Sequence, residues 1–220
     1  MLKKYIPLTL SVLFSLSAQT LNAAQTLPNF TEAQLRVLET LKAPEGQTAL
    51  GAFAKTANTF LGKSFLALLK GDQAAFLENL GSELQKSYEA KADYDTLVAD
   101  FKARTKEQTL DQSLKLGLAF KAATEDSETF VVTVLVTYIT LNPEDTENAT
   151  VYQAVVEKEV KVSKAPSSAD ILAGIAAEGG LKVTNWRNEK VKTAEFFQGQ
   201  QGEEEAPQGV KPPTTATPKE

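Results

Sequence analysis

One uncharged run, Thr129–Leu141, constrains the fold more than any other part of this 220-residue chain. Its residues are β-branched, aromatic or aliphatic, and no Gly or Pro interrupts them. Such a composition is typical of a central strand that is covered on at least one face. The segments before the run have mainly helical patterns, and those after it have strand patterns. We therefore expect an α+β fold in which N-terminal helices pack on a curved antiparallel sheet.

The region before this strand contains clear helix signals. Thr31 and Gln34 have the spacing of a capping box, and Leu35, Leu38 and Leu41 follow as an apolar stripe. Gly71 and Asp72 suit the end of one helix and the N-cap of the next. The sequence predicts a first helix ended by Pro44 and Gly46, then helices over 48–70, 73–80 and 94–106.

The region around and after the central run contains strand signals. The alternating residues Leu114, Leu116, Leu118 and Phe120 predict a strand before the run. Further strands are expected over 150–162 and 181–187, with a helical turn in the loop 167–178. Because the connections between the first three strands are short, we expect an antiparallel meander. Lys158 interrupts the apolar face of the strand 150–162, which predicts that this strand is only partly covered.

The composition excludes several classes of chemistry. The chain has no Cys and no His, which removes Ser-His-Asp and Cys-His mechanisms and the commonest metal ligands. Carboxylate, Lys, Tyr or Ser-Lys schemes remain. A net charge of −5 argues against general attraction to nucleic acid. We therefore expect no nucleic-acid partner, no cofactor and no metal.

The N-terminus has the features of an export signal. Lys3 and Lys4 precede an apolar stretch over 5–16, and small residues suited to cleavage follow at Ser17–Ala18 or Ala23–Ala24. The stretch is short for a membrane span, so an N-terminal anchor is the less favoured alternative. We expect a signal peptide at 1–24, transient membrane contact through it, and a protein exported to the periplasm of a Gram-negative bacterium. Removal of the signal peptide changes the net charge of the chain from −5 to −7.

Acidic residues form three groups, which local structure explains without a metal. One lies mostly at a helix start, where capping accounts for it, and the other two lie in turns, where solvation does. The groups are Asp93, Asp95 and Asp100; Glu125, Asp126 and Glu128; and Glu144, Asp145 and Glu147.

Five aromatic residues are candidates for the lining of a ligand pocket. Such pockets are mostly apolar with a few polar groups, and this composition permits one. The alternative is that these rings complete the core. The candidates are Tyr94, Phe101, Phe120, Tyr138 and Trp186.

The order of elements and the segment Phe65–Phe76, with its Gly71-Asp72 junction, resemble the nuclear transport factor two-like superfamily, and especially its small exported bacterial members of unassigned function. The resemblance implies a cone-shaped α+β domain at 48–198 with a pocket at its open end. A helix and linker at 25–47 would precede it, and a disordered acidic, Pro- and Thr-containing tail at 199–220 would follow. No catalytic residue of the superfamily can be transferred to this chain.

These observations favour a non-catalytic binding or interaction module. Its partner would be a small apolar ligand or an envelope protein. The resemblance implies a homodimer through the outer sheet face, where Thr133, Thr137 and Gln153 lie. The alternatives are an isomerase- or hydrolase-like enzyme that uses a buried carboxylate with Tyr, and a carrier of an apolar ligand such as a lipid.

Overall fold

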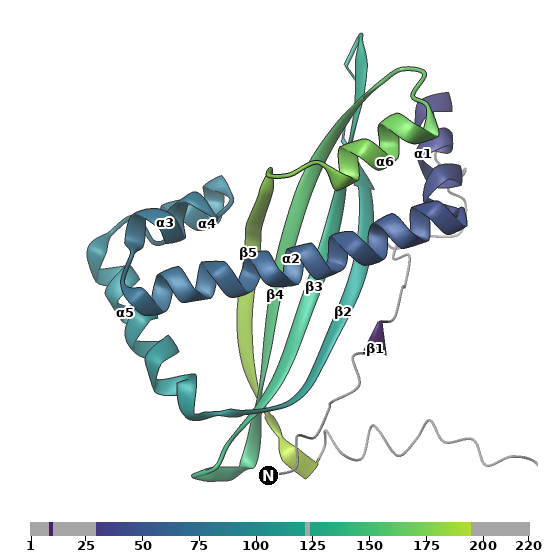
Figure 1. The fold of residues 1–220 in the computed structure, drawn as a ribbon. Coiled ribbons are helices and arrows are strands. Elements are labelled where there is room, and N and C mark those ends of the chain that lie inside the picture. Colours follow the sequence, from purple (N-terminus) through teal and green to yellow (C-terminus); the bar gives the residue numbers. More distant parts are fainter. Residues whose placement is uncertain (1–8, 11–29, 122–123, 195–220) are drawn as a thin grey trace, which may run out of the picture.

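The computed structural model describes residues 9–10, 30–121 and 124–194. Apart from Thr9–Leu10, the predicted signal peptide lies outside these residues, as does the predicted tail. Within them the fold is α+β, with helices on a sheet of four long antiparallel strands (Figure 1). This confirms the expected fold class.

The first two helices form a sharp corner. Helix α1 (Glu32–Lys42) begins with the predicted capping box of Thr31 and Gln34. Helix α2 (Pro44–Lys70) begins one residue after the Ala43 cap, with Pro44 at its first position, where a missing N–H costs nothing. Pro44 therefore starts a helix as well as ending one. The predicted α1 stripe is wrong at Leu35, which is 47% exposed, because the buried face consists of Ala33, Val37, Thr40 and Leu41.

Three helices, each shorter than α2, follow it at one end of the molecule. Gly71 ends α2 in the left-handed conformation (φ 75°), and the Asp72 side chain caps α3 (Gln73–Glu78), both as predicted. Helix α4 (Ser82–Lys86) comes next, and then α5 (Lys91–Ala103), whose last turn tightens into the 3₁₀ helix η1 (Arg104–Lys106). This group lies beside the C-terminal end of α2 (Figure 1).

The sheet is a meander in sequence order. Strands β2 (Gln108–Phe120), β3 (Ser127–Asn142), β4 (Asp145–Ser163) and β5 (Leu181–Lys192) pair antiparallel. The short β1 (Thr9–Leu10) pairs parallel with β2. The run that predicted a central strand forms most of β3, so the meander and its centre are confirmed.

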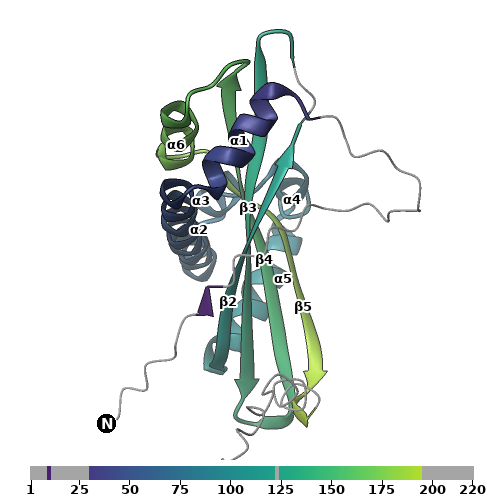
Figure 2. The same cartoon turned by 90° about the vertical axis from the view of Figure 1, so that its right-hand side faces the viewer.

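Helix α2 crosses the strands on one face of the sheet, and the core lies between them (Figure 2). On β3 this face includes Val132, Val134 and Val136, all completely buried. Helix α6 (Ser168–Ala176) connects β4 to β5 and lies on the same side as α2. Alternate residues of each strand point toward the helices. Their side chains therefore meet those of α2 and α6 in the core.

The charged side chain of Lys158 is buried beneath α6. Lys158 is 6% exposed, and its ammonium donates hydrogen bonds to the carbonyls of Ile175 (3.0 Å) and Ala177, at the C-terminal end of α6. A cation is favoured at this end of a helix. The prediction of a partly covered strand at Lys158 is therefore wrong, because α6 covers it.

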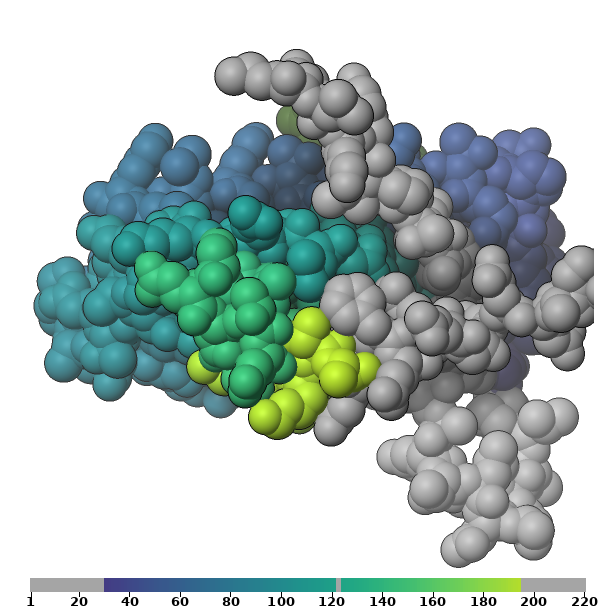
Figure 3. Space-filling view, turned by 90° about the horizontal axis from the view of Figure 1, so that it is seen from below, coloured from purple at the N-terminus to yellow at the C-terminus, as the bar shows by residue number. Residues whose placement is uncertain are grey.

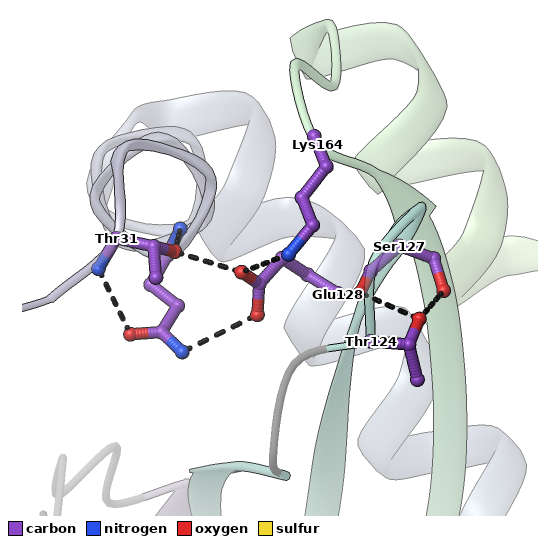
Figure 4. Close-up of polar contacts among 6 residues, drawn as sticks. Thr31, Thr124, Ser127, Glu128 and Lys164 are labelled. Carbon is purple, nitrogen blue, oxygen red and sulfur yellow. Dashed lines mark hydrogen bonds and ion pairs between the residues drawn. The ribbon is translucent and has the colours of Figure 1, made fainter.

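Glu128 is 1% exposed and not solvated as its turn-like sequence context predicted. Its carboxylate accepts a hydrogen bond from the hydroxyl of Thr31 (3.0 Å) and pairs with Lys164 (3.4 Å), as Figure 4 shows. The Gln34 amide is a third donor at 3.4 Å. Glu128 thereby ties the beginning of α1 to the sheet.

Candidate ligand pocket

A pocket of about 260 Å³ lies between the α5–η1 segment and the helix-facing side of β3, β4 and β5. The pocket is near the end of the sheet that contains the β3–β4 hairpin and the end of β5. Figure 3 shows these two segments from below. Its lining consists of Phe65, Asp100, Phe101, Arg104, Thr105, Glu107, Thr109, Tyr138, Thr140, Tyr152, Gln153, Ala154, Trp186, Arg187 and Asn188.

Three rings from three elements form the apolar wall. Phe101 of α5 stacks on Trp186 of β5 with centroids 5.4 Å apart. Phe65 of α2 packs against both, at 4.8 Å from Phe101 and 4.9 Å from Trp186. These separations and tilts are those that aromatic pairs prefer, so the wall is a packed unit.

A cluster of polar side chains from α5, η1 and β4 also lines the pocket. Arg104 donates to one carboxylate oxygen of Asp100 through Nε (3.0 Å) and Nη2 (2.6 Å), and to the hydroxyl of Tyr152 through Nη1 (2.7 Å). The guanidinium also lies 5.1 Å from the centroid of the Tyr152 ring. Asp100 and Arg104 meet because they are one helical turn apart.

Glu107 continues this network into the sheet. Its Oε2 accepts hydrogen bonds from the Tyr152 hydroxyl (3.1 Å) and from the Thr140 hydroxyl. Glu107 directly follows η1 and is partly buried. The Tyr152 hydroxyl is thus an acceptor toward Arg104 and a donor toward Glu107.

Burial raises the pKa of both phenols in the pocket, Tyr138 and Tyr152. Burial raises the pKa of Tyr152 to about 12, with Arg104 opposing the shift and Glu107 adding to it. Burial also raises the pKa of Tyr138, whose hydroxyl donates to Asn58 of α2 at 2.7 Å. For Arg104, burial would lower the pKa, but the hydrogen bonds to Tyr152 and Asp100 outweigh it and raise the pKa.

The structure brings together three of the five aromatic residues singled out in the sequence. Phe101, Tyr138 and Trp186 line the pocket. Tyr94 is completely buried in the core, where its ring packs 5.9 Å from that of Phe76. Phe120 lies at the opposite end of β2 and packs against Phe30. Tyr94 and Phe120 therefore lie outside this pocket.

The polar cluster is not evident from the sequence. From the sequence alone, Asp100 is expected to belong to a helix start, and Arg104, Glu107 and Tyr152 are not candidates. Tyr138 and Tyr152 are register partners on β3 and β4, which the short hairpin between them could have indicated. The spacing of Asp100 and Arg104 was the other available signal.

The arrangement suits a small molecule that is mostly apolar with one polar group. Within residues 9–10, 30–121 and 124–194, no three potential ligands among His, Cys, Asp and Glu come together to hold a metal. In the same part of the chain, no helix has the length and apolar character needed to cross a bilayer. Comparison with protein-family models, with curated proteins and with solved structures finds no match for this chain.

Proposed function

We propose that this protein is an exported, non-catalytic binding protein whose pocket holds a small, mainly apolar molecule with one polar group. The observation that carries the proposal is the pairing, at one opening, of the Phe65–Phe101–Trp186 wall with the Arg104–Tyr152–Glu107 network. Small-molecule sites combine apolar walls with a few convergent polar groups in this way.

The volume favours a small ligand. Pockets for drug-sized molecules usually span about 300–1,000 Å³, and this one is about 260 Å³. A compact metabolite or a short-chain amphiphile fits such a space better than a two-chain lipid does. An apolar-ligand carrier therefore remains within the proposal, for short chains.

Binding is favoured over catalysis because the chain has no His, the commonest general base. The protonated phenol of Tyr152 is available as a hydrogen-bond donor, since burial raises its pKa to about 12. Glu107 favours the second candidate, an isomerase- or hydrolase-like enzyme, because it places a carboxylate beside a Tyr inside the pocket.

The proposal also includes the cellular location of the protein and the superfamily to which its fold belongs. The basic and apolar leader supports export to a periplasm, and the order of helices before a four-strand meander supports a cone of the nuclear transport factor two-like kind. A homodimer through the outer sheet face, where Thr133 pairs with Glu157 and Thr137 with Gln153, belongs to the same set of proposals.

Native mass spectrometry of the protein, expressed with its leader and purified gently, tests the proposal. We expect cleavage of the leader, and a co-purified small molecule on a fraction of the protein. Thr109 is exposed and lines the pocket, so Thr109→Phe should reduce the bound fraction severalfold. Thr146→Phe, an exposed position on β4 that does not line the pocket, is the matched control.

Two results would contradict the proposal. An adduct held equally by wild type and Thr109→Phe would lie outside the pocket. A wild-type protein that retains its leader in the cytoplasm would refute export. The same spectra give the number of subunits, and a strict monomer would remove the homodimer.

A further inference from the structure

Among the described residues, no cation forms an ion pair with the carboxylate of Glu107. Both hydrogen-bond donors to its carboxylate, Tyr152 and Thr140, are neutral hydroxyls. Desolvation of a charge is costly unless it is compensated, so this partly buried carboxylate favours a cation beside it.

The neighbouring cation is already committed to another partner. Arg104 donates two hydrogen bonds to Asp100, with which it forms an ion pair at 2.6 Å. These two charges cancel within the pocket. Arg187 also contributes to the lining, but it is exposed to water, and its Nε donates to its register partner Gln153, which lies on the outer sheet face. Water and salt screen such an exposed charge, so Glu107 leaves the interior with a net negative charge.

The aromatic lining suits a cation as well. Cations are stabilised over the faces of Trp, Tyr and Phe rings, and quaternary ammonium groups are recognised in this way. The pocket has five such rings, from Phe65, Phe101, Tyr138, Tyr152 and Trp186. One of them already has a cation over it, because the Arg104 guanidinium lies 5.1 Å from the Tyr152 centroid.

We propose that the ligand of this pocket is a small monocation, an ammonium or quaternary ammonium group on a short apolar body, with Glu107 as its counter-ion. The aromatic wall takes the apolar body. Oε1 of Glu107 is the oxygen that remains for the cation, since both hydroxyls bond to Oε2. This assignment rests on the proposed binding function and makes Glu107 the residue that determines charge specificity.

The single Trp of the chain gives a direct readout. Trp186 lines the pocket, so its emission reports on occupancy without a label. Three probes with alkyl tails of five or six carbons separate the contribution of charge: hexyltrimethylammonium, 1-hexanol and hexanoate. We expect the cation to bind at least about tenfold more tightly than the alcohol, and hexanoate more weakly than either.

Glu107→Gln tests the assigned residue. The amide keeps the size of the side chain and an acceptor for the hydroxyls but removes the charge. We expect the preference for the cation over hexanol to fall to about twofold or less, with hexanol affinity unchanged. The control is Glu125→Gln, which removes an exposed charge from the turn before β3, at the opposite end of β2 from Glu107. It should leave the preference intact.

The outcomes separate the two proposals. If hexanol or hexanoate binds wild type as tightly as the cation, the cation assignment is overturned while the binding function stands. If Glu107→Gln retains the full preference, Glu107 is not the counter-ion. If no probe changes Trp186 emission at millimolar concentration, both proposals fail. The comparison of the three probes on wild type decides whether the pocket prefers a cation, even if Glu107→Gln does not fold.

Discussion

At the scale of single residues, three tyrosines of this protein differ in how their hydroxyls are satisfied. Tyr138 and Tyr152 donate to Asn58 and Glu107 in and beside the pocket. The hydroxyl of Tyr94 is completely buried and has no hydrogen-bond partner among the described residues. A buried polar group without a partner loses its hydrogen bonds to water and gains nothing in return.

Tyr94→Phe is therefore expected to leave the free energy of unfolding unchanged or to raise it by up to about 1 kcal/mol. The ring keeps its contact with Phe76, and only the unpaired hydroxyl is lost. Urea unfolding followed by circular dichroism measures the change. Tyr138→Phe is the control, because it breaks the bond to Asn58 and should cost about 1 kcal/mol. A loss of more than 1 kcal/mol in Tyr94→Phe would show that this hydroxyl has a partner.

Lys158 provides a pH test. Burial lowers the pKa of its ammonium below the ordinary 10.5. Between the lowered pKa and 10.5, the folded protein has lost this proton while the unfolded chain still holds it. Stability then rises with pH, since the unfolded state binds more protons. We expect wild type to gain stability relative to Lys158→Met as the pH is raised toward 10.

Urea unfolding of both proteins at pH 7, 8.5 and 10 measures this difference. The other titrating groups are common to the two proteins and cancel in it. A difference that stays constant, or that shifts against wild type with rising pH, would contradict a desolvated Lys158 at the end of α6.

At the scale of elements, the corner between α1 and α2 depends on one glycine. Gly46 is buried in the first turn of α2, and a Cβ at this position would lie 2.1 Å from the carbonyl oxygen of Thr40. The two helices could then not approach as closely as they do. By contrast, a Cβ at Gly51, also in α2, would meet nothing within 4 Å.

Gly46→Ala should lower the free energy of unfolding by about 1–3 kcal/mol, the usual range for overpacking. Gly51→Ala should raise it by up to about 1 kcal/mol, because Ala is the better helix former and the site is open. Thermal and urea unfolding measure both. Equal effects of the two substitutions would mean that α1 does not pack at this corner.

Most of these elements could be predicted from local sequence. The Thr31–Gln34 capping box, the Gly71 and Asp72 junction and the alternation in β2 act within a few residues, so they are readable without tertiary structure. The double role of Pro44 and the close packing at Gly46 were not predicted. They depend on how two helices meet, which no local signal encodes.

At the scale of the whole molecule, the pocket exists because α5 and η1 dock beside the sheet. Phe101, Tyr138 and Trp186 were predicted as pocket residues because large aromatic rings, some with polar atoms, are a compositional signal of a mostly apolar pocket. The polar network was not predicted, because Arg104 and Tyr152 are 48 residues apart in sequence and Tyr152 and Glu107 are 45 apart. Only the docking of α5 and η1 joins them.

The buried Glu128 at the other end of the sheet has the same explanation. The residues shortly before it, Glu125 and Asp126, are exposed, and this polar sequence context predicted solvation. Its partners Thr31 and Lys164 come from distant parts of the chain, so its burial follows from the tertiary fold (Figure 4).

The most direct test of the central claim, that this pocket binds a small molecule, is a nitrogen–proton correlation spectrum recorded during titration with hexyltrimethylammonium and, separately, with 1-hexanol. The chain has one Trp, so the indole signal of Trp186 is a single resonance. We predict a saturable shift of this signal and of the Phe101 and Tyr152 amides with at least one probe, while the Ala33 amide in α1 stays fixed. Shifts that do not saturate, or that spread equally to α1, would contradict a specific binding pocket.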